Sequence, residues 1–320
     1  MTSRAYDIHS TAPFASEYHA PAMVDEVVAL LGDRALVLDG TLGGGGHSAA
    51  LLAAGARRII GVDRDPDALA SASLRLTEYA GMRRFSAHRG NYAEPQRIAA
   101  LDTLSFDGIL LDLGISSHQI DDASRGFSFR EGAPLDMRMG DAAASAADVL
   151  NAGPEEALAA IFRDYGDEPQ GGRLAREVVR RRATRPFATA DDFVGAIRGA
   201  LGARTGAPEF ARLFQAVRIA VNDELGGLER ALPALRDRLA PGGRLVVLSY
   251  HSGEDRRVKH AFRRWSEDCI CPPRHPMCSC GGEHALGEVL TRRAQVATPR
   301  EIGSNPRARS AKLRAWQRAG

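Results

Sequence analysis

A glycine-rich run at residues 39–47 is the part of this sequence best suited to binding a small ligand. Glycines let the backbone turn sharply and approach a ligand closely, and a following helix offers its positive end. A Walker loop for nucleoside triphosphates ends in Gly-Lys-Ser/Thr, whereas this run continues as Gly46-His47-Ser48 without a lysine. The dinucleotide fingerprint fits at Gly43 and Gly45 but has Ser48 at its third glycine position, so that match is imperfect.

Three aspartates, Asp39, Asp63 and Asp112, each follow a short apolar run. An acid at Asp39 is unfavourable beside a pyrophosphate, but it suits S-adenosylmethionine, which carries an ammonium and a sulfonium and no phosphate. Asp63 ends the second apolar run, where a carboxylate accepts hydrogen bonds from both ribose hydroxyls of a bound nucleoside. Helix capping or loop solvation would explain one such aspartate, but not three beside a run of glycines.

The apolar runs alternate with helical patterns, which predicts a parallel, doubly wound α/β sheet of the Rossmann type. In the first third of the chain we predict strands over residues 35–39, 59–63, 85–88 and 109–112, with helices over residues 48–54 and from Pro66. Ligands of such sheets bind at the carboxyl ends of the strands. We therefore expect the three aspartates at one edge.

A long helical stretch interrupts this alternation. The next strong strand, residues 244–249, follows Asp112 by far more than the ~30 residues of an ordinary strand–helix–strand unit. Apolar residues at helical spacing predict helices over residues 155–165, 173–182, 191–201 and 210–225. We assign residues 120–222 to an all-helical insertion that serves as the substrate domain, and residues 1–119 and 223–320 to the α/β core. Residues 311–317 are expected to form an edge strand.

Composition and charge limit the function classes. The 320 residues are 44% hydrophobic and 26% charged, which is typical of a globular protein and excludes a disordered or collagen-like chain. The apolar runs are far shorter than the ~20 residues of a membrane span, and the N-terminal residues lack the apolar core of a secretory signal. We therefore expect no membrane association and a cytoplasmic location. The net charge is only +2, but residues 171–186 and 292–320 are strongly basic, which suits a polyanionic partner.

Several longer motifs follow one another from about His19 to the C-terminus. They are Asp39-Gly-Thr-Leu-Gly-Gly-Gly-Gly-His-Ser48, Val62-Asp-Arg-Asp-Pro66, Gly108-Ile-Leu-Leu-Asp-Leu-Gly-Ile-Ser-Ser117, Arg125-Gly-Phe-Ser-Phe129, Pro134-Leu-Asp-Met-Arg-Met139, Phe214-Gln-Ala-Val-Arg-Ile-Ala-Val-Asn-Asp-Glu-Leu225, Ser249-Tyr-His-Ser-Gly-Glu-Asp255 and Asn305-Pro-Arg-Ala-Arg-Ser310. Together they resemble the bacterial 16S ribosomal RNA cytosine-N4 methyltransferase family. The resemblance implies a class I, S-adenosylmethionine-dependent methyltransferase fold with an inserted helical domain. It also implies a substrate, the exocyclic N4 amine of a cytidine in the decoding region of 16S rRNA in the small ribosomal subunit.

By motif position, the resemblance implies which residues contact the cofactor S-adenosylmethionine. These are Gly45, Gly46, His47, Asp63, Tyr92, Asp112 and Gln119. Tyr92 stands where the family often has phenylalanine, and it keeps a ring available to pack on adenine. Tyr250 and Gly253 replace the more usual phenylalanine and leucine, and neither change removes a ligand group.

The chemistry of methyl transfer suggests further site residues. The N4 lone pair of cytosine is delocalised into the ring, so the amine must be aligned with the methyl group, offered a hydrogen-bond acceptor and shielded from water. Asp112 is one candidate for this catalytic acceptor, although we favour a cofactor contact for it. His251 is the other, with a hydrogen-bonded loop histidine as the alternative. No aromatic residue follows Asp112 directly, so the ring that stacks on the target base is expected from Tyr250, Phe127 or Phe129.

RNA contacts are predicted mainly from the helical insertion. Arg218 and Asn222 share one face of the predicted helix 210–225, where we expect them to contact RNA or the hinge between the domains, with a structural ion-pair seam as the alternative. The arginines of residues 173–185 and of the C-terminal segment are candidates for phosphate contacts. We do not expect RNA to bind residues 101–170, because they are strongly acidic and would repel its phosphates.

All four cysteines, Cys269, Cys271, Cys278 and Cys280, lie close together. Zinc sites commonly use Cys-x2–4-Cys pairs, and the Cys-x-Cys spacing here is tighter. We therefore predict thiols without a metal, with a structural zinc site as the alternative. Methyl transfer itself needs no metal.

Two other functions compete with methyl transfer. A nicotinamide dehydrogenase uses a related sheet, but the missing third glycine and the acid at Asp39 argue against it. The other is a ribosome-assembly factor that keeps the fold without catalysis. Both a monomer and a homodimer are compatible with the sequence.

Overall fold

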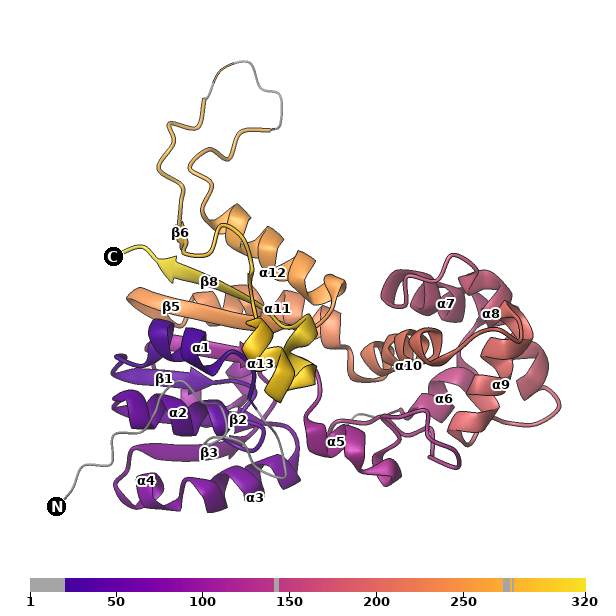
Figure 1. Cartoon of the computed structure of the whole chain (residues 1–320). Helices are drawn as coiled ribbons and strands as arrows, with labels where there is room; N and C mark the ends of the chain where they lie inside the picture. The colour runs from indigo at the N-terminus through magenta and orange to yellow at the C-terminus, as the bar shows by residue number, and fades with distance from the viewer. Residues whose placement is uncertain (1–20, 141–143, 273–276, 278) are drawn as a thin grey trace. The chain divides into compact units, whose positions relative to one another are not determined.

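The computed structural model describes residues 21–140, 144–272, 277 and 279–320 (Figure 1). These residues fall into two compact units. The sheet unit comprises the described residues up to Gly114 together with Gly227–Gly320, and the helical unit comprises Ile115–Gly226. In the part of the chain that the structure describes, no helix is long and apolar enough to span a bilayer.

A mixed sheet forms the centre of the sheet unit (Figure 1). Its strands are β1 Leu36–Asp39, β2 Arg58–Asp63, β3 Phe85–Arg89, β4 Phe106–Asp112, β5 Leu239–Ser249, β6 Gly287–Val289, β7 Gln295–Val296 and β8 Lys312–Arg318. The order is β3-β2-β1-β4-β5-β8-β6, and β7 pairs with β8. Strands β1 to β5 are parallel, whereas β8 runs antiparallel to β5. The predicted α/β sheet is confirmed, and its parallel strands bring the ends of β1, β2 and β4 to one edge.

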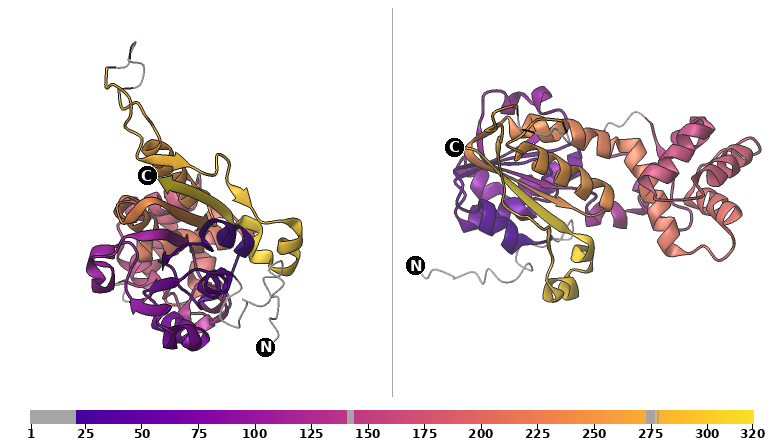
Figure 2. Two further views of the ribbon diagram at one scale, coloured as in Figure 1. Left: turned by 90° about the vertical axis from the view of Figure 1, so that its left-hand side faces the viewer. Right: turned by 90° about the horizontal axis from the view of Figure 1, so that it is seen from above.

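Helices cover both faces of the sheet, because successive residues of a strand point to opposite sides (Figure 2). Val37 of β1 packs in a cluster with α1 Val24–Leu31, α2 Gly46–Ala54 and α3 Pro66–Arg75. Its neighbour Leu38 packs in a second cluster, with α11 Glu224–Arg236 and α12 Ser252–Trp265. The shorter helices α4 Thr77–Gly81 and α13 Pro299–Ser304 complete this unit.

The start of α3 shows how the local sequence sets an element. Asp65 is the N-cap, and its carboxylate accepts a hydrogen bond from the Asp67 N–H at 3.1 Å. Pro66 occupies the first helical position, where its missing N–H costs nothing. This helix therefore begins where the sequence predicts it, directly after the end of β2.

The helical unit has its own apolar core. Its helices are α5 Ser117–Asp121, α6 Ala146–Ala152, α7 Glu155–Ala160, α8 Gly171–Arg182, α9 Ala190–Leu201 and α10 Ala207–Asn222. At the centre lies Phe193, whose ring centroid is 5.9 Å from that of Phe162 and 5.1 Å from that of Phe214. All three rings are buried, so the apolar stripes predicted for these helices do form one core.

Three local predictions are wrong. The helix predicted over residues 210–225 ends at Asn222, because Asp223 adopts a left-handed conformation (φ 48°) and α11 begins at Glu224. The helix predicted over residues 155–165 changes to a π-helical segment, Ile161–Tyr165, after α7. The run at residues 311–317 is not an edge strand, since β8 pairs with β5 on one side and with β6 on the other.

Candidate active site

The glycine-rich loop links the end of β1 to the start of α2. Gly43 and Gly45 have left-handed backbones, with φ of 51° and 73°. A Cβ at Gly45 would lie 3.1 Å from the Cβ of Ala72, and one at Gly40 would lie 2.7 Å from Leu111 Cδ2. The loop therefore needs glycine for its conformation and for its close packing, as the sequence predicts.

Asp39 holds this loop from within. It is 1% exposed; its Oδ2 accepts a hydrogen bond from the Ser48 hydroxyl at 2.7 Å, and its Oδ1 accepts one from the Thr41 N–H at 3.3 Å. Burial raises the pKa of its carboxyl above the ordinary value, and the hydrogen bond from Ser48 offsets only part of this rise. Asp39 thus ties the loop to α2, and a direct ligand contact for it stays a prediction.

Asp63, at the end of β2, touches the same loop. Its Oδ2 accepts a hydrogen bond from the Gly43 N–H at 2.8 Å, and its Oδ1 accepts one from the Asp65 N–H at 2.9 Å. Burial raises the pKa of Asp63 to about 6. A carboxylate offers about four acceptor positions, so these two contacts leave capacity for two hydroxyl donors.

Asp112, at the end of β4, lies in a group of polar residues. Its N–H donates to Thr41 Oγ1 at 2.6 Å, which joins β4 to the glycine-rich loop. The Tyr250 hydroxyl donates to Asp112 Oδ1 at 2.8 Å, and His47 Nδ1 lies 3.6 Å from Asp112 Oδ2. Burial, followed by the neighbouring Asp112, raises the pKa of Tyr250 well above its ordinary value, so Tyr250 stays a hydrogen-bond donor at neutral pH.

The two ring nitrogens of His47 lie near different groups. Its Nε2 lies 2.8 Å from the carbonyl oxygen of Ala22, in a buried position. Because a carbonyl only accepts, Nε2 carries the hydrogen and Nδ1 is the atom turned towards Asp112. The sheet unit therefore brings together three of the predicted residues, His47, Asp112 and Tyr250.

His251 lies at the start of α12, immediately after Tyr250. Its Nε2 is 3.3 Å from Glu254 Oε1, and Glu254 Oε2 accepts a hydrogen bond from the Tyr250 N–H at 2.8 Å. Among the described contacts, the His251 backbone N–H donates to Glu254 Oε2 at 3.4 Å, and no contact joins His251 to Asp112. Glu254 and Thr41 are two positioning residues that the sequence reasoning missed. A glutamate three residues into a helix is a capping signal, and it could have identified Glu254.

Tyr92 and Gly46 also lie beside the glycine-rich loop. Tyr92 follows β3, and its Cβ would be 3.3 Å from a Cβ placed on Gly40. Gly46 is the first residue of α2 and is buried. Both thus lie near the end of β1, and their predicted contacts to the cofactor stay predictions.

Gln119, Arg218 and Asn222 belong to the helical unit, where each has a structural contact. Gln119 Oε1 accepts from the Ser116 N–H at 3.0 Å in the capping box of α5. Arg218 forms two hydrogen bonds with the Glu224 carboxylate, at 2.8 and 2.9 Å.

Asn222 is buried, and its Oδ1 accepts from the Met139 N–H while its Nδ2 donates to the Met137 carbonyl, both at 2.8 Å. These contacts all join residues within the helical unit. The predicted cofactor role of Gln119 and the predicted RNA roles of Arg218 and Asn222 stay predictions.

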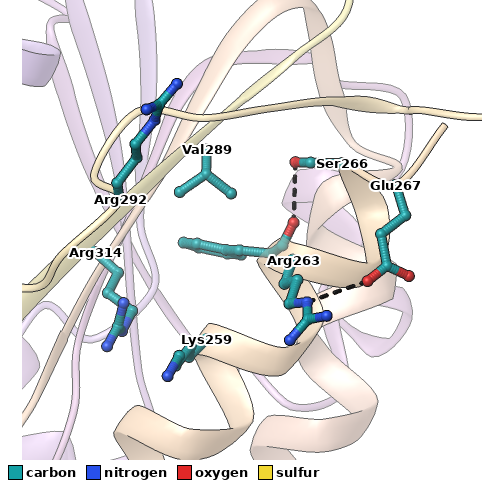
Figure 3. A pocket seen from close by; sticks show the side chains of 8 residues that line it. Lys259, Arg263, Ser266, Glu267, Val289, Arg292 and Arg314 are labelled. Carbon is teal, nitrogen blue, oxygen red and sulfur yellow. Dashed lines mark hydrogen bonds and ion pairs between the residues drawn. The ribbon is translucent and has the colours of Figure 1, made fainter.

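A cavity of about 300 Å³ lies elsewhere in the sheet unit, between α12 and strands β6 and β8 (Figure 3). Its lining residues are Lys259, Phe262, Arg263, Ser266, Glu267, Val289, Arg292 and Arg314. None of the residues predicted to contact the cofactor lines this cavity, but Arg292 and Arg314 belong to the C-terminal arginines predicted as candidates for phosphate contacts.

Known proteins are similar to this chain over nearly its whole length. The model of the MraW methylase family matches residues 16–319. A "Ribosomal RNA small subunit methyltransferase H" from Gemmatimonas aurantiaca is 61% identical over 94% of this chain and 96% of its own length. The protein of the same name from Heliobacterium modesticaldum is 46% identical over 94% of this chain and 98% of its own. Among solved structures, an rRNA methylase from Streptococcus thermophilus is similar over 93% of this chain and 94% of its own, with 11% identity and a TM-score of 0.41.

Proposed function

Because the chain belongs to the MraW methylase family, we propose that it methylates the exocyclic N4 amine of a cytidine in the decoding region of 16S rRNA, with S-adenosylmethionine as methyl donor. The observation that carries the proposal is the 61% identity, over nearly the full length of both chains, to a small-subunit ribosomal RNA methyltransferase. The row of aspartates at the end of β1, β2 and β4 supports the same ligand. Family membership also disfavours the dehydrogenase alternative.

The residues of the sheet edge fit S-adenosylmethionine. The left-handed backbones of Gly43 and Gly45 set the shape of the loop, and the nearest described atom to a Cβ placed on Gly43 would be 3.9 Å away, so a ligand can lie against the backbone there. Asp63 has acceptor capacity beyond its two backbone contacts, which suits the two ribose hydroxyls. We place Tyr92 against adenine, and Gly46 and His47 beside the methionine portion.

The bound cofactor would supply a methyl group activated by its sulfonium. The Tyr250 hydroxyl donates to the Asp112 carboxylate, and Thr41 Oγ1 accepts from the Asp112 N–H, so both the side chain and the backbone of Asp112 are held in place. We assign Asp112 to the cofactor ammonium, since a carboxylate favours a cation nearby. His251, held by Glu254, is then the candidate acceptor for a hydrogen of the target amine.

These two assignments can be separated by kinetics. If Asp112 contacts the cofactor, Asp112→Asn raises KM for S-adenosylmethionine more than it lowers kcat. If Asp112 instead accepts from the amine, Asp112→Asn lowers kcat with KM nearly unchanged. His251→Ala should show the second pattern, and a kcat within about threefold of wild type would remove His251 from the proposal.

RNA binding is proposed for the helical unit, chiefly through α8. Arg180 and Arg181 both form ion pairs with Glu177, at 2.8 and 2.6 Å, while Arg182 donates to the carbonyls of the Leu150 and Gly153 backbone. Two arginines on one glutamate leave a net positive charge. Arg180 is the more exposed of the pair, so it is the better placed for a phosphate.

The test of the proposed function is methyl transfer to small ribosomal subunits from a cell that lacks this activity. With labelled S-adenosylmethionine, the 16S rRNA should acquire label, and nuclease digestion should release it as N4-methylcytidine. Asp63→Ala should label far more slowly, while Asp67→Ala, an exposed acid four residues along the chain, serves as the matched control. Label in a different nucleoside, or none with an enzyme that binds the cofactor, would overturn the proposal. We place this activity in the cytoplasm.

A further inference from the structure

Three thiols gather in the segment between α12 and β6. The sulfur atoms of Cys269, Cys271 and Cys280 all lie within 4.8 Å of one another. Figure 1 shows this segment leaving the end of α12 and returning to β6, away from the sheet. It takes no part in the site at the ends of β1, β2 and β4, so these thiols are left unexplained by the proposed function.

The sulfur–sulfur distance indicates which chemistry the cluster supports. Cys269 Sγ and Cys280 Sγ are 3.8 Å apart. A disulfide would require about 2.05 Å. In a tetrahedral zinc site with Zn–S bonds of about 2.3 Å, neighbouring sulfurs are separated by about 3.8 Å. The observed separation excludes a disulfide in this structure and matches the spacing of two ligands on one metal ion.

The backbone around the thiols is arranged to favour thiolates. The Ser279 N–H donates to Cys271 Sγ at 3.3 Å, and the Ser279 hydroxyl lies 3.6 Å from the same sulfur. Such N–H donors orient and stabilise metal-bound thiolates.

Two glycines follow the cluster directly. Gly281 and Gly282, with φ of 82° and 75°, turn the chain just after Cys280. The tight Cys-x-Cys spacing is no obstacle, because the sulfur atoms of Cys269 and Cys271 lie within 4.8 Å of each other and of Cys280 Sγ. Cys269 and Cys271 can therefore face one ion from one segment while Cys280 approaches from the other.

The described apolar residues of this segment are largely exposed. Ile270 and Met277 are 66% and 79% exposed. Two backbone hydrogen bonds close its base, from His284 N–H to the Asp268 carbonyl at 3.2 Å and from Leu286 N–H to the Trp265 carbonyl at 2.7 Å. A short segment with so little buried apolar surface is the usual place for a covalent or metal cross-link.

We propose that Cys269, Cys271 and Cys280 bind one Zn²⁺ ion, which fixes the segment between α12 and β6. Three zinc–sulfur bonds form as the three thiols release their protons, so no oxidant is needed. Cys278 lies outside the described residues, and the site does not depend on it. Water or a further ligand takes the remaining position of the tetrahedron. The inference does not rest on the proposed methyl transfer.

The test begins with the metal content of the full-length protein, purified with a reductant and without a chelator. Mass spectrometry of metals should find about one zinc ion per chain. After zinc is removed, added Co²⁺ should produce the intense thiolate-to-cobalt absorption of a tetrahedral sulfur site. Cys269→Ser and Cys280→Ser should each lose most of the bound metal. Ser304→Ala, at an exposed serine of α13 outside this segment, keeps all the thiols and their contacts, so it should bind metal like the wild type.

Three results would overturn the proposal. The first is a metal-free protein whose thiols are all free and which gives no cobalt–thiolate absorption. The second is a protein whose intact mass lacks two hydrogens because Cys269 and Cys280 form a disulfide. The third is full zinc content in Cys269→Ser and Cys280→Ser. The cobalt spectrum of the wild type decides the question even where a variant fails to fold.

Discussion

Replacing Asp63 with alanine should weaken binding of S-adenosylmethionine by about 10²- to 10⁴-fold. In the proposed complex the carboxylate accepts two ribose hydroxyls, and a hydrogen bond to a charged group contributes about 1.5–3 kcal/mol. Two such bonds give about 3–6 kcal/mol, and each 1.4 kcal/mol is about a tenfold change in affinity. The variant also loses the acceptor that holds the Gly43 N–H, which loosens the glycine-rich loop. Asp63→Asn keeps one carbonyl oxygen and should lose less.

The assay is isothermal calorimetry with S-adenosylmethionine, beside Asp67→Ala as the control of equal charge change. Thermal unfolding separates a local effect on binding from a global loss of stability.

Because burial raises the Asp63 pKa to about 6, the folded state disfavours its charge, so the wild type should lose stability as pH rises from about 4 through 6. That loss is at most about 3 kcal/mol, and Asp63→Ala should lack it. An Asp63→Ala protein that binds the cofactor within about threefold of wild type would refute the pocket assignment.

Three further predictions follow from the same structure. Cofactor affinity should fall up to tenfold per pH unit below about pH 6, because Asp63 must be ionised to accept both hydroxyls, and calorimetry between about pH 5 and 8 should show no such dependence in Asp63→Asn. Gly45→Ala should cost about 1–2 kcal/mol of folding free energy in urea denaturation, because its backbone is left-handed, whereas Gly172→Ala, in a helix with open space around it, should cost nothing. Phe193→Ala should destabilise the helical unit by about 3–5 kcal/mol in the same assay, and a loss no larger than that of Phe129→Ala, at a 37% exposed ring, would contradict the assigned core.

The placement of the aspartates was predictable because it follows from a general property of parallel sheets. Asp39, Asp63 and Asp112 each end an apolar run, and parallel strands end at one edge, so their proximity needs no knowledge of distant contacts. The conformation of Gly43 and Gly45 was predictable for a similar reason, since only glycine adopts left-handed backbones readily.

What the sequence did not reveal depends on contacts between distant segments. The end of α10 depends on the left-handed conformation of Asp223, which aspartate tolerates but which an aspartate in the sequence does not by itself predict. The interior place of β8 depends on its pairing with β6, which no local pattern encodes. Asn222 looks like a surface residue of an amphipathic helix, yet it is buried against the backbone of Met137 and Met139. The proximity of Cys269 to Cys280, which are eleven residues apart in the sequence, likewise is not encoded in a local pattern.

The most direct test of the central claim is a crystal structure of the full chain with S-adenosylmethionine bound. We predict that the ligand lies at the carboxyl ends of β1, β2 and β4, with its ribose hydroxyls on Asp63 and its ammonium facing Asp112. A ligand found in the cavity beside Phe262 and Lys259, or a ribose held by residues other than Asp63, would contradict the account.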